Sequence, residues 1–467
     1  MPSRDAGGRG APVRMQRIAV VVPTGALRDA LVRVAAAGTV ELDPADGAGA
    51  PGESARRLSR LHAPRADPVL SVARPDLDAL ERDGRLDLLA GEVQLEEHAA
   101  AGVTKGSVTA VVGWSPVAAL PALGLRLAEV GGAAVPLPRP PGAEPPTLMP
   151  DTPARRPFAP LVETYATVPY ADVDPSVVAG VAYVIMFGAM FADAGHGAVL
   201  LLLALFIRTG RPRRLAGLRT VWPFLAGAGV ATMVFGLLYG EFFGPTGVLP
   251  VLWVAPLDEP VQLLLAGIGL GAVFLAGAYG LGTVNRWREG GWRNALYAPS
   301  GLAGAGLFLG LGLASAGWYR DLSWLSWTGA GIAALSLALA FAGLLAQAGR
   351  GGAAALEATI ELFDIVIRLG SNLVSFARLA AFGLTHAALG FVVWDATTSL
   401  WGRGTAAGVA AVLVFVLGNA VTFALEALVA GVQALRLEYY ELFSRVFQGE
   451  GRPFRPWRLP VLEKVAP

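Results

Sequence analysis

The chain has no cysteine among its 467 residues, and its only lysines are Lys105 and Lys464. The absence of cysteine excludes disulfides, thiolate metal sites and cysteine nucleophiles. Neither lysine follows the glycine that a Walker A loop requires, so the sequence has no P-loop for ATP. Charged residues are scarce as well, at 16% with a net charge of +1, and nothing in this balance favours nucleic acid. We expect no cofactor and no metal.

What the chain has in abundance is apolar sequence, at 54% hydrophobic residues, and it is unevenly distributed. Residues 1–150 predict a small cytoplasmic α/β domain, and 151–175 a proline-rich linker. Residues 176–447 are apolar enough to predict a helical, polytopic membrane domain, followed by a cytoplasmic tail at 448–467. The amino-terminal residues lack the apolar core of a signal peptide, so we expect no cleaved leader.

Two segments of the amino-terminal region resemble copies of one unit, 17–43 and 109–138. Each is typical of a strand, a proline-containing turn, an amphipathic helix, a glycine and a second strand. They predict two small α/β lobes joined by a short connector, which contains a charged helix near 76–101. Two unrelated strand–helix–strand pieces remain the alternative interpretation.

Membrane-length apolar segments fill the rest of the chain, because a crossing helix needs about 20 apolar residues. The first segment is interrupted at 193–197 and predicts a hairpin of two short helices, which gives about eight crossings. The arginines of 208–219 and of the loop at Arg350 favour the cytoplasmic side, and both termini are then cytoplasmic. The candidate segments are 176–208, 219–243, 260–285, 298–317, 325–346, 369–400 and 405–436.

Two arginines lie within the last two of these segments, Arg378 and Arg436. A charge at bilayer depth costs at least about 2.5–3.5 kcal/mol, so such residues usually serve a function. Each belongs to a polar stripe with helical spacing. At about 1.5 Å per residue, the arginines of the two antiparallel helices have similar depth, and His386 and Glu426 lie together nearer the exterior. The stripes are Ser371, Ser375, Arg378, Thr385 and His386, and Asn419, Thr422, Glu426, Gln433, Arg436 and Tyr440.

Simpler interpretations remain open for these residues. Arg378 could pair with Glu426 as a buried lock, and Arg436 could extend to the cytoplasmic surface. His386 could be a core histidine with all its hydrogen bonds made. Asp193 and His196 could be polar residues at the tip of the predicted hairpin.

The motif SFARLAAFGLTHA at 375–387 resembles the signature of the membrane stator subunit of V-type and archaeal-type rotary ATPases, called subunit I in prokaryotes and subunit a in eukaryotes. Further stretches resemble the same family in the same order. They are MFGAMFADAGHG at 186–197, FGLLYGEFFG at 235–244 and LRLEYYELFSRVFQGEGRPFRPW at 435–457, with 157–158 and 170–175 leading in. Two features depart from the family: the cytoplasmic part is short, and Ala192 replaces a usual glycine.

The resemblance implies a role for each motif residue. Arg378 would face the carboxylate of a rotating proteolipid ring, with Arg436 supporting it. Glu426 and His386 would line an external half-channel, and Glu441 with Glu361 or Asp364 a cytoplasmic one. Ser375 and Gln433 would also lie on the proton path. Asp193 and His196 belong to the hairpin motif.

The expected partners are the ring, membrane lipid, peripheral stalk subunits and, indirectly, the catalytic complex that handles ATP, in a bacterial plasma membrane. A secondary transporter or channel is the alternative, and would be expected to carry inverted repeats. A third possibility is an assembly paralogue without transport. The sequence leaves open proton or sodium, synthesis or hydrolysis, and how the short cytoplasmic domain binds a stalk.

Overall fold

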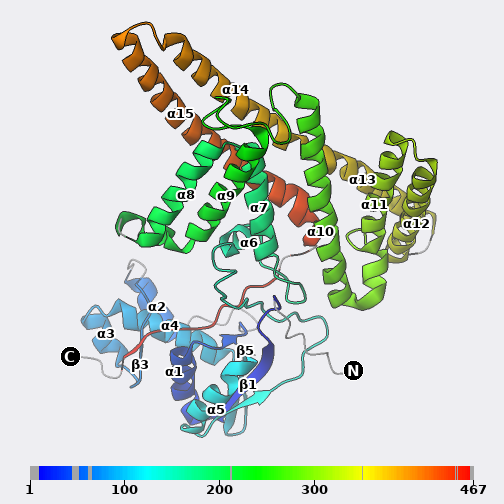
Figure 1. Ribbon diagram of the computed structural model, residues 1–467. Helices are drawn as coiled ribbons and strands as arrows, with labels where there is room; N and C mark the ends of the chain where they lie inside the picture. The colour runs from blue at the N-terminus through cyan, green and yellow to red at the C-terminus, as the bar shows by residue number, and fades with distance from the viewer. Residues whose placement is uncertain are drawn as a thin grey trace. The chain divides into compact units, whose positions relative to one another are not determined.

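The computed structural model describes residues 10–44, 52–61, 66–210, 213–349, 351–447, 449 and 451–462. The chain forms two compact units (Figure 1). The membrane-type unit comprises 151–450 with 1–11, and the small unit comprises 12–150 with 451–467. Arg211 and Arg350, two of the arginines used to predict orientation, lie outside the described residues.

The small unit is an α/β fold built on one antiparallel sheet. Its strand order is β2-β5-β1-β6, and β4 pairs with β5. The sheet strands are β1 (Met15–Pro23), β2 (Glu41–Leu42), β4 (Val103–Lys105), β5 (Val108–Pro116) and β6 (Ala133–Pro136). The helices are α1 (Leu27–Ala37), α2 (Glu53–Arg60), α3 (Leu77–Arg82), α4 (Leu86–Ala100) and α5 (Leu120–Ala128).

The two predicted copies are both present, and they share this sheet instead of forming a sheet each. In each copy a nine-residue strand ends in proline, a 3₁₀ turn follows, and a helix then begins. Strands β1 and β5 pair antiparallel from Met15 opposite Pro116 to Pro23 opposite Val108. The second strand of each copy pairs with the first strand of the other. This is the strand order of the β-α-β-β-α-β motif, in which neither half is complete alone.

The end of the chain belongs to the small unit and not to a free tail. Strand β7 (Val461–Leu462) pairs in parallel with β3 (Leu70–Ser71). Trp457 and Leu459 are buried in the core of this unit. Trp457 also donates from its indole Nε1 to Gln94 Oε1 at 3.0 Å. The tail therefore supplies both a strand and core side chains.

In the larger unit, six helices are long and apolar enough to cross a membrane. Two further apolar helices, α7 and α8, have 15 and 16 residues. The helical, membrane-type architecture is confirmed, whereas a count of eight crossings stays a prediction. The helices are α6 (Ala159–Tyr165), α7 (Ser176–Met190), α8 (Ala194–Thr209), α9 (Trp222–Tyr239), α10 (Pro260–Tyr297), α11 (Leu302–Tyr319), α12 (Ser323–Ala348), α13 (Gly352–Ser375), α14 (Ala377–Leu400), α15 (Thr405–Leu437) and α16 (Ser444–Val446).

The first apolar segment is broken as predicted, but at Phe191–Asp193 and not over 193–197, because α8 already begins at Ala194. Asp193 is the N-cap of α8, and its carboxylate accepts from the backbone N–H of His196 at 2.8 Å. Such caps satisfy backbone donors that have no partner within the helix. The hairpin packs against α9 through glycines: a Cβ at Gly236 would lie 2.1 Å from the nitrogen of Ala194. Only glycine allows this approach.

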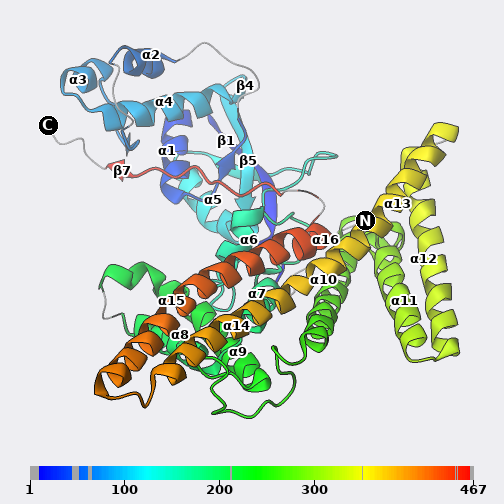
Figure 2. The same cartoon turned by 90° about the horizontal axis from the view of Figure 1, so that it is seen from above.

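Helices α14 and α15 lie side by side and run obliquely to α7, α9 and α10 (Figures 1 and 2). They are long, at 24 and 33 residues, as the prediction of two long tilted helices requires. Helix α13 continues into α14 past an interruption at Phe376. The α14–α15 pair crosses the α7–α8 hairpin, and His386, Glu426, Asp193 and His196 lie close together at that crossing.

Candidate functional site

Arg378 lies two residues beyond the interruption between α13 and α14. The turn tightens there: Phe376 donates to the carbonyl of Leu373 at 3.2 Å, and Leu379 donates to that of Phe376 at 2.9 Å. Such i to i−3 bonds replace α-helical ones where a helix is locally overwound. Phe376 is fully buried, with its ring 6.4 Å from that of Phe274 on α10. The junction and hence Arg378 are therefore fixed by packing on α10.

Arg378 is half-buried, and its Nη1 has no hydrogen-bond partner among the residues that the structure describes. The charged side chains that act on it are Arg436 and Glu441. Arg436 itself is exposed on α15. The two arginines therefore share one region, as their predicted depths require. No ion pair joins Arg378 to Glu426 in the described part of the chain, since Glu426 contacts His386 instead.

Glu441 lies on a short π-helical turn, Glu438–Phe443, that ends α15. π-Helical turns are rare and often occur at functional sites. In the amide orientation that satisfies both neighbours, Asn372 donates to Glu441 Oε2 at 2.9 Å and accepts from Arg445 Nη2 at 3.0 Å. The Ser375 hydroxyl also lies beside Glu441. This cluster places Ser375 and Glu441 together next to Arg378.

Sequence reasoning missed Asn372 and Arg445. Asn372 lies six residues before Arg378, about 120° around an α-helix from it, so helical periodicity gives no signal for it. Nothing local in the sequence indicates that Arg445 reaches Asn372.

His386 and Glu426 meet where α14 and α15 cross the hairpin. His386 Nδ1 contacts Glu426 Oε2, which confirms the prediction that these two residues have similar depth. His386 is 2% exposed, and its Nε2 lies 3.8 Å from Asp193 Oδ2. His196 is equally buried, with its ring centroid 5.5 Å from that of His386. Asp193 and His196 are thus buried within the helix crossing and are more than polar residues at a hairpin tip.

Asp193 organises the loop that follows α9 as well as its own helix. Its carboxylate accepts from the backbone N–H of Phe243 at 3.0 Å and of Gly244 at 2.7 Å. Phe243 has φ of +50°, a left-handed conformation that costs an ordinary residue about 1–2 kcal/mol. Hydrogen bonds to an ionised carboxylate are worth about 1.5–3 kcal/mol each and offset that strain. Glu241, at 2% exposure, is buried in the same loop.

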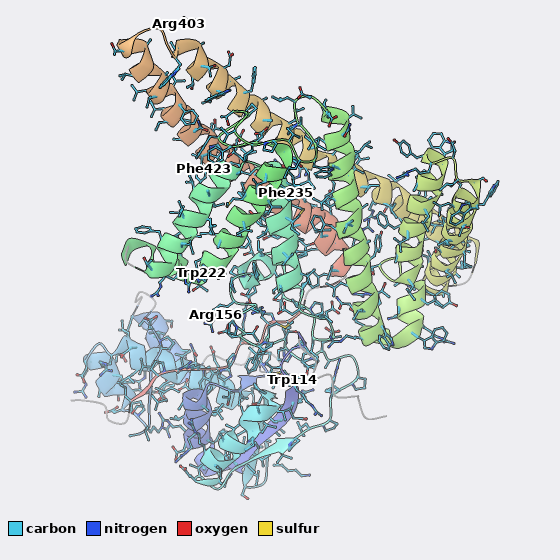
Figure 3. The ribbon with its side chains drawn as sticks, in the orientation of Figure 1. Trp114, Arg156, Trp222, Phe235, Arg403 and Phe423 are labelled. Carbon is cyan, nitrogen blue, oxygen red and sulfur yellow. The ribbon has the colours of Figure 1, made fainter. Side chains whose placement is uncertain are left out.

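Aromatic rings surround this buried cluster. Phe423 on α15 packs edge-on against Phe191 and at a tilt against His196, with ring centroids 5.6 and 5.7 Å away. Figure 3 shows Phe423 partway along α15 where it crosses the hairpin, and Arg403 at the distant tip of the α14–α15 pair. These rings pack around the two histidines.

Other predicted residues lie away from these clusters. Glu361 is exposed on α13, and Asp364 pairs with Arg368 one turn along the same helix. Ser371 and Thr385 are exposed, and the Thr385 hydroxyl donates to the carbonyl of Ala381. Gln433 is half-buried, and its Oε1 has no partner among the described residues.

The geometry therefore has two polar clusters, one around Arg378 and Glu441 and one around His386 and Glu426. Comparison with known protein families identifies the family to which a chain with these two clusters belongs. A family model described as the V-type ATPase 116 kDa subunit family matches residues 104–244 and 352–459. These ranges make up more than half of the sequence and include both clusters. The chain belongs to the V-type ATPase 116 kDa subunit family.

Relatives in this family include proteins named A-type ATP synthase subunit I. The one from Thermococcus kodakarensis is 28% identical over 321 residues, covering 65% of this chain and 46% of that protein. The one from Methanocaldococcus jannaschii is 26% identical over 347 residues, covering 67% and 49%. The chain thus spans about half the length of the curated relatives it matches. The family model leaves α10, α11 and α12 unmatched, although α10 carries the surface on which Phe376 packs.

Proposed function

We propose that this chain is the membrane stator subunit of a rotary ATPase, where it passes protons to and from a rotating ring of small proteolipid subunits. The observation that carries the proposal is Arg378, which is half-buried at the α13–α14 junction without a carboxylate partner among the described residues. A charged arginine within the membrane costs free energy unless a negative charge comes close to it. The ring carboxylate is that counter-charge.

The surface near Arg378 fits a large apolar partner. Exposed apolar side chains line α15 along its length and on more than one face. A ring of apolar helices, together with lipid, would cover them. They are Val409, Val412, Leu413, Val416, Leu417, Val421, Leu425, Leu428, Val429 and Val432.

A fixed cation favours the ionised form of a ring carboxylate as it passes, and so promotes release of its proton. Arginine stays charged at any working pH, so it also blocks protons from crossing directly between the two sides. Lysine loses its proton more easily when desolvated. This difference explains why the position holds arginine.

The two polar clusters are then separate half-channels. Glu441 with Ser375 would serve the cytoplasmic side, together with Asn372, and Glu426 with His386 the external side. His386 is eight residues beyond Arg378, or about 12 Å along an α-helix, so protons must travel on the ring to pass from one to the other. Gln433 would contribute between them. Glu361 and Asp364 are weaker candidates because they lie outside these clusters.

This function implies a topology and partners. We infer eight crossings, with α7 and α8 as short crossings, and both termini in the cytoplasm of a bacterium. Peripheral stalk subunits would hold the small unit, and a separate catalytic complex would handle ATP. The relatives are named as ATP synthase subunits, which supports this assignment. The direction of coupling and the identity of the ion lie outside it.

ATP-driven acidification of vesicles carrying the whole complex tests the proposal. Arg378→Lys is compared with Arg403→Lys, the same change at the exposed tip of the α14–α15 pair. Loss of pumping only in Arg378→Lys, with the complex assembled, would support the stator function. Undiminished pumping would show that Arg378 is a structural charge. Proton transport by the purified chain without any ring subunit would instead favour a transporter acting alone.

A further inference from the structure

The buried side chains of Asp193, His196 and His386 bring potential metal-ligand atoms close together. One ligand atom from each lies within 4.8 Å of the other two. Asp193 Oδ1 is 3.7 Å from His196 Nδ1, and Asp193 Oδ2 is 3.8 Å from His386 Nε2. Two ligand atoms bound to one Zn²⁺ at about 2.0–2.1 Å are roughly 3.3 Å apart in a tetrahedron. The two Asp–His separations involve different oxygens of the Asp193 carboxylate, and each is about 0.4–0.5 Å longer than that spacing. A bound ion would draw the three side chains slightly closer together.

The ring nitrogens that face this space have no hydrogen-bond partner among the described residues. These are both nitrogens of His196 and Nε2 of His386. The side chain of Asn419 lies beside His196, and its amide donates to the carbonyl of Phe415 on its own helix at 2.9 Å. An unsatisfied buried polar atom costs about 1–3 kcal/mol, so three of them in one place indicate a missing ligand.

The surrounding contacts match those of a metal site. The remaining nitrogen of His386, Nδ1, contacts the Glu426 carboxylate. A ligating histidine usually donates its other N–H to a carboxylate in this way, which fixes its tautomer and orientation. Asp193 is fixed as well, by the backbone N–H groups of His196, Phe243 and Gly244. The ligands are therefore oriented before any metal binds.

The carboxylates around these side chains also favour the binding of a cation. In the described part of the chain, the recorded ion-pair partners of Asp193 and Glu426 are histidines only, with neither arginine nor lysine among them. Glu241 lies next to this cluster, since its backbone carbonyl accepts a hydrogen bond from the backbone N–H of Ala194. Its side chain is buried, and its Oε2 has no hydrogen-bond partner among the described residues. Buried carboxylates are costly unless they are paired or bind metals.

From these observations we propose that Asp193, His196 and His386 form a site for a divalent transition metal ion of the Zn²⁺ type. Imidazole and carboxylate ligands suit Zn²⁺, which prefers four tetrahedral ligands. Glu241 or a water completes the set. The occupied site removes Nε2 of His386 from proton exchange. If the proposed function holds, the metal therefore inhibits pumping from the external side.

Metal binding by the full-length purified chain tests the site without reference to transport. The probe is Zn²⁺ alone, titrated in competition with a chromophoric zinc indicator. We expect one equivalent bound by the wild type, and at least about tenfold weaker binding by His196→Gln and by His386→Gln. Loss of a carboxylate that hydrogen-bonds a ligating histidine typically weakens metal affinity about 10–100-fold, so Glu426→Gln should also weaken binding by about tenfold or more. His98→Gln is the matched control, because His98 stacks on Trp457 in the small unit.

X-ray absorption at the zinc edge of the wild-type chain is the second measurement, and it does not depend on any variant folding. Two imidazole ligands with the remaining ligands oxygen are expected. Any one of three results would overturn the site. They are no bound equivalent of Zn²⁺, Zn²⁺ binding that neither histidine substitution changes, and a zinc-edge spectrum with fewer than two imidazole ligands. Because binding is read directly, failure of the stator assignment would leave this result intact, and the reverse also holds.

Discussion

Phe376 at the α13–α14 junction packs directly on Gly271 of α10, where a Cβ would lie only 2.2 Å from the ring Cγ. A helix that the family model does not match thus sets the position of the turn that carries Arg378.

Gly271→Ala should displace this ring and with it Arg378. Overpacking a buried contact costs about 1–3 kcal/mol, and we expect lowered thermal stability together with reduced pumping. Gly269→Ala is the control on the same helix, since nothing lies within 4 Å of its added Cβ. Alanine is the better helix former by up to about 1 kcal/mol, so the control should be neutral or stabilising. Equal melting temperatures of the two variants would contradict the role given to the Phe376 contact.

Glu441, and not Glu361, should carry proton transfer on the cytoplasmic side. Glu361 lies 17 residues before Arg378, or about 25 Å along a helix, whereas Glu441 is close enough to influence Arg378 electrostatically. Glu441→Gln should lower ATP-driven acidification at least about tenfold, because acid–base groups contribute 10²–10⁴-fold. Glu361→Gln is the matched change and should pump like the wild type. The reverse pattern would move the half-channel onto α13.

Asp193→Asn should destabilise the α7–α8 hairpin and the loop around Phe243. The neutral amide keeps one acceptor oxygen but loses charge-assisted hydrogen bonds, each worth about 1.5–3 kcal/mol. We expect a drop of that size in the free energy of unfolding, followed by chemical denaturation in detergent. Asp395→Asn makes the same change at an exposed position of α14 and should have little effect. Similar losses in both variants would mean that the three backbone hydrogen bonds contribute nothing specific.

Asp172, in the linker before α7, should give the chain a pH-dependent stability. It is fully buried, and burial, with the nearby Glu289 carboxylate adding to it, raises its pKa to about 8. The folded state therefore holds this proton more tightly than the unfolded chain does. Its contribution is complete below about pH 4, declines as pH rises, and is lost above about pH 8.

Asp172→Asn should remove that decline between pH 5 and 9 and make the variant more stable than the wild type at the alkaline end. Thermal unfolding at several pH values measures the slope. Asp151→Asn is a suitable control, because the Arg156 guanidinium holds the pKa of Asp151 below its usual range, outside this window. Parallel slopes for wild type and Asp172→Asn would exclude a raised pKa at this position.

The sequence predicted the membrane-length helices and the similar depth of His386 and Glu426, since helical periodicity and rise determine which residues share a face and a depth. It also predicted the break at Asp193, where a capping residue follows an apolar run. Local patterns carry these features.

Features that depend on distant packing were not predictable. The contact between Asn372 and Glu441 joins helices through side-chain orientation, and the junction at Phe376 depends on Gly271, more than 100 residues earlier. The sharing of one sheet by both strand–helix–strand copies is likewise decided by which strand edges pair. Neither periodicity nor composition encodes such pairings.

The last strand of the small unit has a consequence for how the protein is made. Trp457, Leu459 and β7 leave the ribosome after every membrane helix, although they complete a core that begins with β1. Until then the earlier part of that core has exposed apolar surface for the whole time of membrane insertion, the condition under which chaperones are needed. A ribosome that stalls anywhere within the membrane segments therefore leaves the small unit unfinished as well.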